Sequence, residues 1–166
     1  MLRRRGAAIL LCAGQPPGAL DRRRPEVADT EQNKAVVRDC YVYASQGDAA
    51  RLSEILDSDF VIHTPEDHHG VDGLLGMVGA VKAGLPDLKV TIDAQFADGD
   101  YVATRFTARG THDGDLFGTP ATGREVELSG ITISRCADGR IAEEWELVDA
   151  VGALQQIGAL GAPASA

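Results

Sequence analysis

Cysteine is scarce in this chain, and its placement excludes two kinds of stabilised fold. The 166 residues include three cysteines, Cys12, Cys40 and Cys136, and no pair has the C-x-x-C spacing of a zinc or redox site. An odd number of scattered cysteines does not form a disulfide framework, and it is typical of proteins in the reducing cytoplasm. Because Cys40 and Cys136 fall on apolar stripes, we expect both to be small core residues.

Long apolar runs and internal repeats are also missing. The apolar run of residues 7–13 is much too short to cross a membrane. With the arginines before it, the run resembles the start of a secretory signal peptide, but three further arginines at 22–24 oppose export. We therefore expect residues 1–28 to be a disordered basic leader of a cytoplasmic protein, with secretion as the alternative.

Positive charge is scarce outside this leader. The whole chain has a net charge of −9, yet residues 1–28 carry six arginines against only Asp21 and Glu26. The remaining residues carry 10 basic and 23 acidic side chains. An acidic domain repels phosphate backbones, which argues against a nucleic-acid partner.

Helical periodicity begins at residue 29, where we place the start of the domain. Asp29 is a good N-cap residue, and the apolar residues that follow it recur at helical spacing as far as Gly47. Asp48 should cap a second, shorter helix, and a third is expected from about Val71 to Ala83.

Strands dominate the second half of the chain. A short strand at 59–65 precedes a polar loop at 66–70, and residues 88–148 predict a long antiparallel sheet. Gly130 interrupts the alternation of one strand, as at a bulge. A short helix capped by Asp149 should close the domain near residue 160, with residues 161–166 as a flexible tail.

This order of elements predicts an α+β fold. Helices grouped before an antiparallel sheet do not have the alternation of βαβ units. A strongly curved antiparallel sheet wrapped over three helices would form a cone-shaped barrel with a central pocket. We therefore expect one cone-shaped α+β domain over residues 29–160.

The last strand carries the best candidates for acid–base chemistry. Its alternation puts Glu144 and Glu146 on one face, and Glu143 and Trp145 on the other. A carboxyl group held against apolar surface has a raised pKa and can transfer protons near neutral pH. Most acidic residues on strands face water, so a solvated pair is the alternative, and the spacing leaves open which face lines the pocket.

A family resemblance extends over about residues 30–160. The segments that carry it are Gly110-Thr111-His112, residues 117–123, Gly130-Ile131, Asp138-Gly139-Arg140-Ile141, Trp145 and Gln156-Ile157-Gly158. In these segments the chain resembles the SnoaL-like polyketide cyclases of the nuclear-transport-factor-2-like superfamily, which includes ketosteroid isomerase. The resemblance implies a cone-shaped barrel that binds a small hydrophobic polyketide-like ligand, without a metal or cofactor, as a homodimer.

The resemblance also implies an enzymatic activity. The best-understood members of the family close a ring of an aromatic polyketide ester by intramolecular aldol condensation, and an aspartate on the last strand serves as acid and base. Glu146 stands at the position of this aspartate, Gly130 at that of a glutamine and Thr132 at that of a histidine. These are three departures from the cyclase pattern, and they bear on the reaction rather than on the fold.

Histidines are candidates for the hydrogen-bond donor that an enolate requires. We expect His63, at the end of an apolar strand, and His112, in the glycine-rich stretch, to join Glu146 as catalytic residues. The alternatives are a strand-end histidine bonded to backbone and a residue that forms a turn. The adjacent pair His68 and His69 has no third ligand at a suitable spacing, so we expect no metal site.

Aromatic and polar residues near these positions are candidates for binding the substrate. They are Tyr41, Phe60, Phe106, Phe117, Thr132, Glu144 and Trp145. Because Trp145 and Glu146 alternate along one strand, we expect one of them to line the pocket and the other to point away.

Three functions are compatible with this pattern. The first is a cofactor-independent cyclase with Glu146 as acid and base. The second is another reaction on the same fold, such as epoxide hydrolysis or double-bond isomerisation, although we recognise no Asp-Arg-Asp arrangement. The third is a non-catalytic small-molecule-binding dimer module, which the loss of the family's glutamine and histidine favours.

Overall fold

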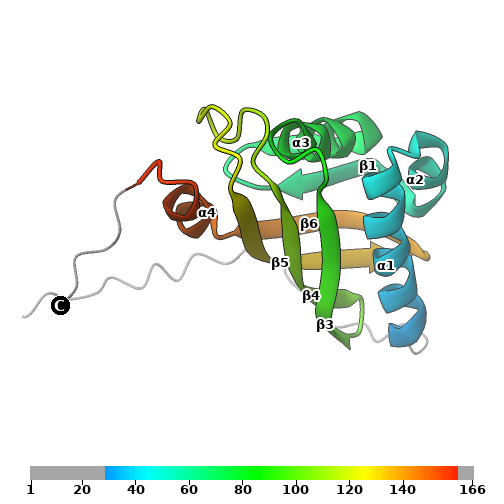
Figure 1. Ribbon diagram of the computed structural model, residues 1–166. Coiled ribbons are helices and arrows are strands. Elements are labelled where there is room, and N and C mark those ends of the chain that lie inside the picture. Colours follow the sequence, from blue (N-terminus) through cyan, green and yellow to red (C-terminus); the bar gives the residue numbers. More distant parts are fainter. Residues whose placement is uncertain (1–28, 161–166) are drawn as a thin grey trace, which may run out of the picture.

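The computed structural model describes residues 29–160, which form four helices and six strands (Figure 1). In chain order the elements are α1 (Thr30–Gln46), α2 (Ala49–Ile55), β1 (Leu56–His63), β2 (Asp67–His69), α3 (Gly70–Gly84), β3 (Lys89–Asp98), β4 (Tyr101–Thr111), β5 (Glu125–Ala137), β6 (Arg140–Val148) and α4 (Ala150–Gln156). The predicted leader, residues 1–28, and the predicted tail, residues 161–166, lie outside the described residues. None of the helices in residues 29–160 has the length and apolar character needed to span a membrane.

The six strands form one curved sheet in the order β2-β1-β6-β5-β4-β3. Strands β3 to β6 pair antiparallel as predicted, but β1 runs parallel to β6, so the sheet is mixed rather than wholly antiparallel. No hairpin joins β1 to β6, so the chain does not force them to be antiparallel. Figure 1 shows α4 at the opposite end of the sheet from α1 and α2. With helices against a curved, unclosed sheet, the predicted α+β cone is confirmed.

Helices α1, α2 and α4 begin at the predicted capping residues, and α1 also ends at its predicted glycine. The Asp29 side chain accepts hydrogen bonds of 3.1 Å from two backbone N–H groups in the first turn of α1, and Gly47 ends the helix with a φ of 71°. Asp48 and Asp149 cap α2 and α4 in the same way. These contacts satisfy backbone groups that a helix end leaves unpaired.

Two local predictions are wrong. Residues 66–70 are not a plain loop, because Asp67–His69 form β2 and pair with the end of β1. Gly130 is not part of a bulge, because it pairs in regular register with Phe106 on β4 and Val148 on β6. A Cβ atom at position 130 would overlap the ring of Phe106. The glycine therefore makes room for an aromatic side chain from the neighbouring strand.

Buried apolar side chains form two clusters. The first joins α1, α2 and α3 to strands β1, β4, β5 and β6 and includes Cys40 and Cys136, both of which are buried and unpaired as predicted. The second packs α4 against β4, β5 and the segment after α3, and includes Leu128. Cys40 and Leu128 also line a common cavity, which therefore separates the two clusters.

Alternation along the strands gives the sheet an inner face toward the helices and an outer face. On the outer face, the cross-strand register aligns Phe96, Ala103, Ile133, Trp145 and His63 in a single row. The exposed fraction is 72% for Phe96, 42% for Ile133 and 38% for Trp145. The outer face is therefore unusually apolar for a surface in contact with solvent.

Candidate active site

A cavity of about 400 Å³ lies between the inner face of the sheet and helices α1 and α3. Most of its lining is aliphatic or aromatic, and the polar or titratable side chains in it are Cys40, Tyr41, Ser45, Thr64, Lys82, Thr132, Glu144 and Glu146. This size and composition are typical of small-molecule sites, which enclose about 300–1,000 Å³ and combine apolar surface with a few polar groups.

Glu146 faces this cavity from β6, and a chain of hydroxyl groups holds it there. It lies directly across from Thr132 on β5, whose hydroxyl donates a hydrogen bond of 3.1 Å to Glu146 Oε2. The hydroxyl of Tyr41 in α1 donates in turn to Thr132 Oγ1 over 2.9 Å. Burial raises the pKa of Glu146, and the bond from Thr132 opposes this effect in part. Glu146 is therefore an oriented carboxyl group in an apolar site.

Glu144 faces the same cavity and is buried more deeply. Its side chain is 4% exposed, and Ser134 on β5 donates a hydrogen bond of 2.5 Å to Glu144 Oε1. Burial raises the pKa of Glu144 to about 7, and the charge of Glu146 adds to the increase, whereas the bond from Ser134 opposes it. The inner face of β6 thus carries two carboxyl groups whose proton affinities differ with their burial.

Four other predicted ligand-binding residues differ in where they lie. Tyr41 and Phe106 line the cavity with their ring centroids 5.6 Å apart. Phe117, from the loop between β4 and β5, also lines it and is 48% exposed, which places it at the opening. Phe60 is 1% exposed within the first core cluster and is absent from the cavity lining. Phe60 therefore serves packing rather than the cavity.

His112 lies outside the cavity, although the sequence suggests it as a catalytic residue. Its ring is fully buried, with Nδ1 2.9 Å from Thr122 Oγ1 and Nε2 3.2 Å from the carbonyl oxygen of Thr119. Its backbone also bonds to Arg124 and to the N–H groups of residues 122 and 123. His112 therefore holds the loop between β4 and β5 in shape, and both of its ring nitrogens are occupied.

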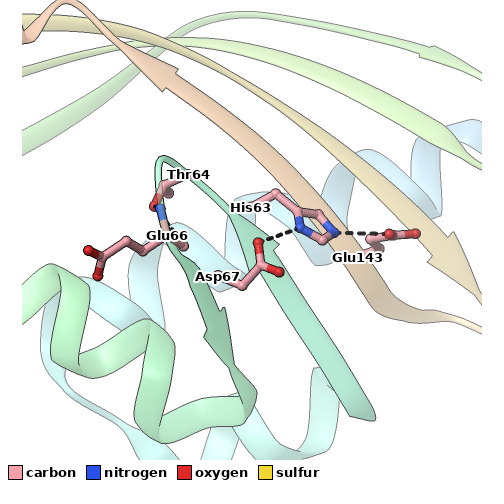
Figure 2. Close-up of polar contacts among 5 residues, drawn as sticks. All are labelled: His63, Thr64, Glu66, Asp67 and Glu143. Carbon is pink, nitrogen blue, oxygen red and sulfur yellow. Dashed lines mark hydrogen bonds and ion pairs between the residues drawn. The ribbon is translucent and has the colours of Figure 1, made fainter. Parts of the chain in front are cut away.

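His63 and Trp145 lie on the outer face of the sheet, away from the cavity. Figure 2 shows His63 between two carboxylates, with Nδ1 2.8 Å from Asp67 and Nε2 3.1 Å from Glu143. Hydrogen bonds to Asp67 and Glu143 raise the pKa of His63, and its ring stacks on Trp145 at 5.6 Å between centroids. Because Phe60 and Ile62 point inward on β1, alternation turns His63 outward. Of the two alternatives on β6, Glu146 lines the cavity and Trp145 does not.

No group of three or more His, Cys, Asp or Glu side chains within residues 29–160 is arranged to hold a metal ion. His68 and His69 lie on the short strand β2, where neighbouring side chains point to opposite faces.

Several residues that shape the site are missing from the sequence prediction. Met77, Val78 and Val81 of α3 line the cavity, and each remains only partly buried for that reason. Their apolar stripe predicts an ordinary core helix, so the sequence pattern alone does not reveal their role. Ser134 could have been identified, because it lies two residues beyond Thr132 on the same strand face.

Comparison with known proteins agrees with this fold. The sequence model described as "SnoaL-like polyketide cyclase" matches residues 35–157. Wild-type IdmH from Streptomyces antibioticus is 36% identical in a match that covers 76% of this chain and 99% of that chain, with a TM-score of 0.67. TsrD from Streptomyces laurentii is 26% identical over 80% of this chain and 98% of that chain, with a TM-score of 0.71.

A curated relative matches a shorter segment. Aklanonic acid methyl ester cyclase DnrD from Streptomyces peucetius is 34% identical over 61 residues, which is 37% of this chain and 42% of that protein. The match thus spans less than half of that relative.

Proposed function

The chain belongs to the SnoaL-like polyketide cyclase family, and from this premise we propose that it closes a ring of a polyketide-like substrate by intramolecular aldol or related acid–base chemistry, without a cofactor. Family membership confirms the resemblance that the sequence shows. The observation that carries the proposal is the orientation of Glu146, whose carboxyl group faces an apolar cavity and is held by Thr132.

Glu146 would act first as a base and then as an acid. Its carboxylate removes a proton from a carbon between two carbonyl groups, and the resulting enolate carbon attacks a ketone in the same molecule. The protonated Glu146 then returns the proton to the new alkoxide. A pKa raised by burial suits both steps, because the group must accept and release a proton near neutral pH.

The departures from the cyclase pattern form a connected arrangement in this chain. Thr132, at the family's histidine position, donates to Glu146, and Tyr41 donates to Thr132. Gly130, at the family's glutamine position, leaves the space that Phe106 fills. The ring of Phe106 and a chain of hydroxyl groups thus take the place of the glutamine and histidine in the family's pattern. The name of DnrD, an aklanonic acid methyl ester cyclase, supports a polyketide methyl ester as the substrate class to test first.

Epoxide hydrolysis is the second candidate, and one observation favours it. Glu144 and Glu146 both face the cavity, and two carboxyl groups side by side can hold and activate a water molecule. Incubation with an aromatic epoxide in H₂¹⁸O distinguishes this reaction, because a hydrolase places ¹⁸O in a diol product whereas an aldol cyclase leaves the epoxide intact.

A second copy of this chain is the partner that we propose for the outer face of the sheet. Ile131 and Leu147 are 53% and 80% exposed, and they lie opposite each other beside the apolar row. The edge of this surface carries charges of both signs, including Arg135 bonded to Glu143. A copy related by a twofold axis could therefore cover the apolar row without placing like charges together.

The cytoplasm is the compartment that we propose for the chain. Cys40 and Cys136 are unpaired and buried, which suits a reducing environment.

Substitution of Glu146 tests the proposed function. Glu146→Gln keeps the shape and the bond from Thr132 but cannot accept a proton, so turnover of an aromatic polyketide methyl ester should fall by about 10²–10⁴-fold. Glu143→Gln makes the same change on the outer face of the same strand and should leave turnover unchanged. Circular dichroism of both variants checks that they fold. Unchanged turnover in Glu146→Gln would end the proposal, and tight binding of the ester without turnover by the wild type would favour a binding module.

A further inference from the structure

The cavity contains a second carboxyl group, Glu144, to which the proposed aldol step gives no role. Glu144 and Glu146 lie two residues apart on β6, so their Cα atoms are separated by about 7 Å on the same face of the strand. Each lies across from a hydroxyl residue of β5, Ser134 for Glu144 and Thr132 for Glu146. The two carboxyl groups are therefore held independently, at neighbouring positions of one surface.

No cationic side chain within residues 29–160 forms an ion pair with either carboxyl group. Lys82, which also lines the cavity, donates to the carbonyl oxygen of Ser45 over 3.0 Å. Two like charges in an apolar site disfavour each other, so the pair retains a proton at a pH where isolated carboxyl groups have lost theirs. Glu144 is the more deeply buried of the two, which assigns the retained proton to Glu144.

One oxygen of Glu144 is available to a ligand. Oε1 accepts the hydroxyl of Ser134, whereas Oε2 has no hydrogen-bond partner among the described residues. No buried side-chain oxygen or nitrogen in this part of the chain lacks a partner. Oε2 must therefore be open to the cavity that Glu144 lines.

We propose that Glu144 is a second catalytic residue, a neutral carboxylic acid that donates a hydrogen bond to the carbonyl oxygen of the substrate while Glu146 removes the adjacent C–H proton. This inference rests on the proposed function and extends it to the stabilisation of the enolate. It supplies the donor that His63 and His112 cannot supply, because His63 lies on the outer face and both ring nitrogens of His112 are occupied.

The step is balanced without a co-reactant. The C–H bond breaks as an O–H bond forms on Glu146, and the electron pair moves through the new C=C bond to the carbonyl oxygen. That oxygen becomes an enolate held by the O–H of Glu144, which keeps its proton. When the enolate carbon attacks the ketone, the carbonyl re-forms and Glu146 returns its proton to the new alkoxide. Both residues are then in their starting protonation states.

The thiol and phenol groups near the pair stay neutral near pH 7. Burial raises the pKa of Cys40 and of Tyr41, the two such groups that α1 contributes to the cavity, so both remain neutral. Lys82 of α3 is the cationic group in the lining and is bonded to backbone. Burial also raises the pKa of Cys136 on β5 to about 11, so Cys40, Tyr41 and Cys136 do not titrate near pH 7.

Carboxyl ¹³C NMR on protein labelled in glutamate tests the protonation directly. The resonance that disappears in Glu144→Gln should titrate near pH 7, and the resonance that disappears in Glu146→Gln should titrate above the ordinary glutamate value. Titration of Glu144 near the ordinary glutamate value of about 4.5 would overturn the proposal. This measurement needs no substrate.

Hydrogen–deuterium exchange into α-tetralone, an aromatic ketone with acidic C–H groups, tests the catalytic role. In the wild type, the rate of exchange should fall as pH rises above about 7, because Glu144 then loses the proton that it donates. Glu144→Gln retains a neutral N–H donor, so exchange should continue at a rate within about tenfold of the wild type and should not fall above pH 7. Glu144→Leu has no donor and should slow exchange by about 10²–10³-fold, as loss of an oxyanion donor does.

Three results separate this inference from the proposed function. Exchange that persists in Glu146→Gln contradicts the proposed base. Exchange that is lost in Glu146→Gln but proceeds at the wild-type rate in Glu144→Leu overturns only the role of Glu144. A wild-type loss of rate above pH 7 that persists in Glu144→Gln also overturns it.

Discussion

Replacement of Glu144 by glutamine should remove a pH dependence from the stability of this domain. The pKa of Glu144 is about 7 in the fold, because the group is buried, and about 4.5 when unperturbed. Between these values the folded state holds a proton that the unfolded chain has released. Stability therefore falls as pH rises through this window. At about 1.4 kcal/mol per pKa unit, the loss reaches about 3 kcal/mol above pH 7.

Urea denaturation at about pH 5 and about pH 8.5 measures the effect. The free energy of unfolding of the wild type should fall more between these pH values than that of Glu144→Gln, by up to about 3 kcal/mol. His63, whose raised pKa also makes stability fall as pH rises, is present in both proteins and cancels in the comparison. Glu54→Gln, on the exposed surface of α2, is the matched control and should behave as the wild type does. An unaltered pH dependence in Glu144→Gln would refute the reasoning, because Glu144 would then ionise in the fold as it does in water.

Three further substitutions test other parts of the structure. Tyr41→Phe removes one hydrogen bond, of about 1 kcal/mol, from the chain of hydroxyl groups that orients Glu146 through Thr132, so kcat should fall about fivefold. A fall in kcat as large as that in Glu146→Gln would contradict this prediction. Gly130→Ala should lower the free energy of unfolding by about 1–3 kcal/mol in thermal denaturation, because the added methyl group overlaps Phe106, and a neutral result would show that the ring can move aside. Leu147→Asp should convert a dimer to a monomer in size-exclusion chromatography without loss of turnover, and an unchanged elution volume would refute the proposed interface.

Much of the fold could be predicted because it depends on local chemistry. Aspartate before an apolar helical pattern determines where α1 and α2 begin, and Gly47 determines where α1 ends. Alternation along β6 places Glu144 and Glu146 on a common face, as the sequence predicts. The sequence does not predict which face of β6 lines the cavity, because both faces carry acidic and apolar residues. The choice is made by helices α1 and α3, which cover the inner face.

The errors involve contacts between distant segments. The sequence predicts His63 to be a pocket residue, but β1 lies beside β6, where His63 pairs with Trp145 on the outer face. His112 lies in a glycine-rich stretch that suggests an exposed loop, yet Thr119 and Thr122 fold back over its ring. The sequence predicts a bulge at Gly130. The position is glycine because the ring of Phe106, on another strand, occupies the space that a side chain would need. Local sequence patterns do not contain these pairings.

A crystal structure with an unreactive analogue of an aromatic polyketide methyl ester would test the central claim most directly. The account predicts that the analogue occupies the cavity between β6 and helices α1 and α3, with the carbon to be deprotonated within about 3.5 Å of a Glu146 carboxyl oxygen. An analogue bound elsewhere, or one bound in the cavity with Glu146 turned away from it, would contradict the account.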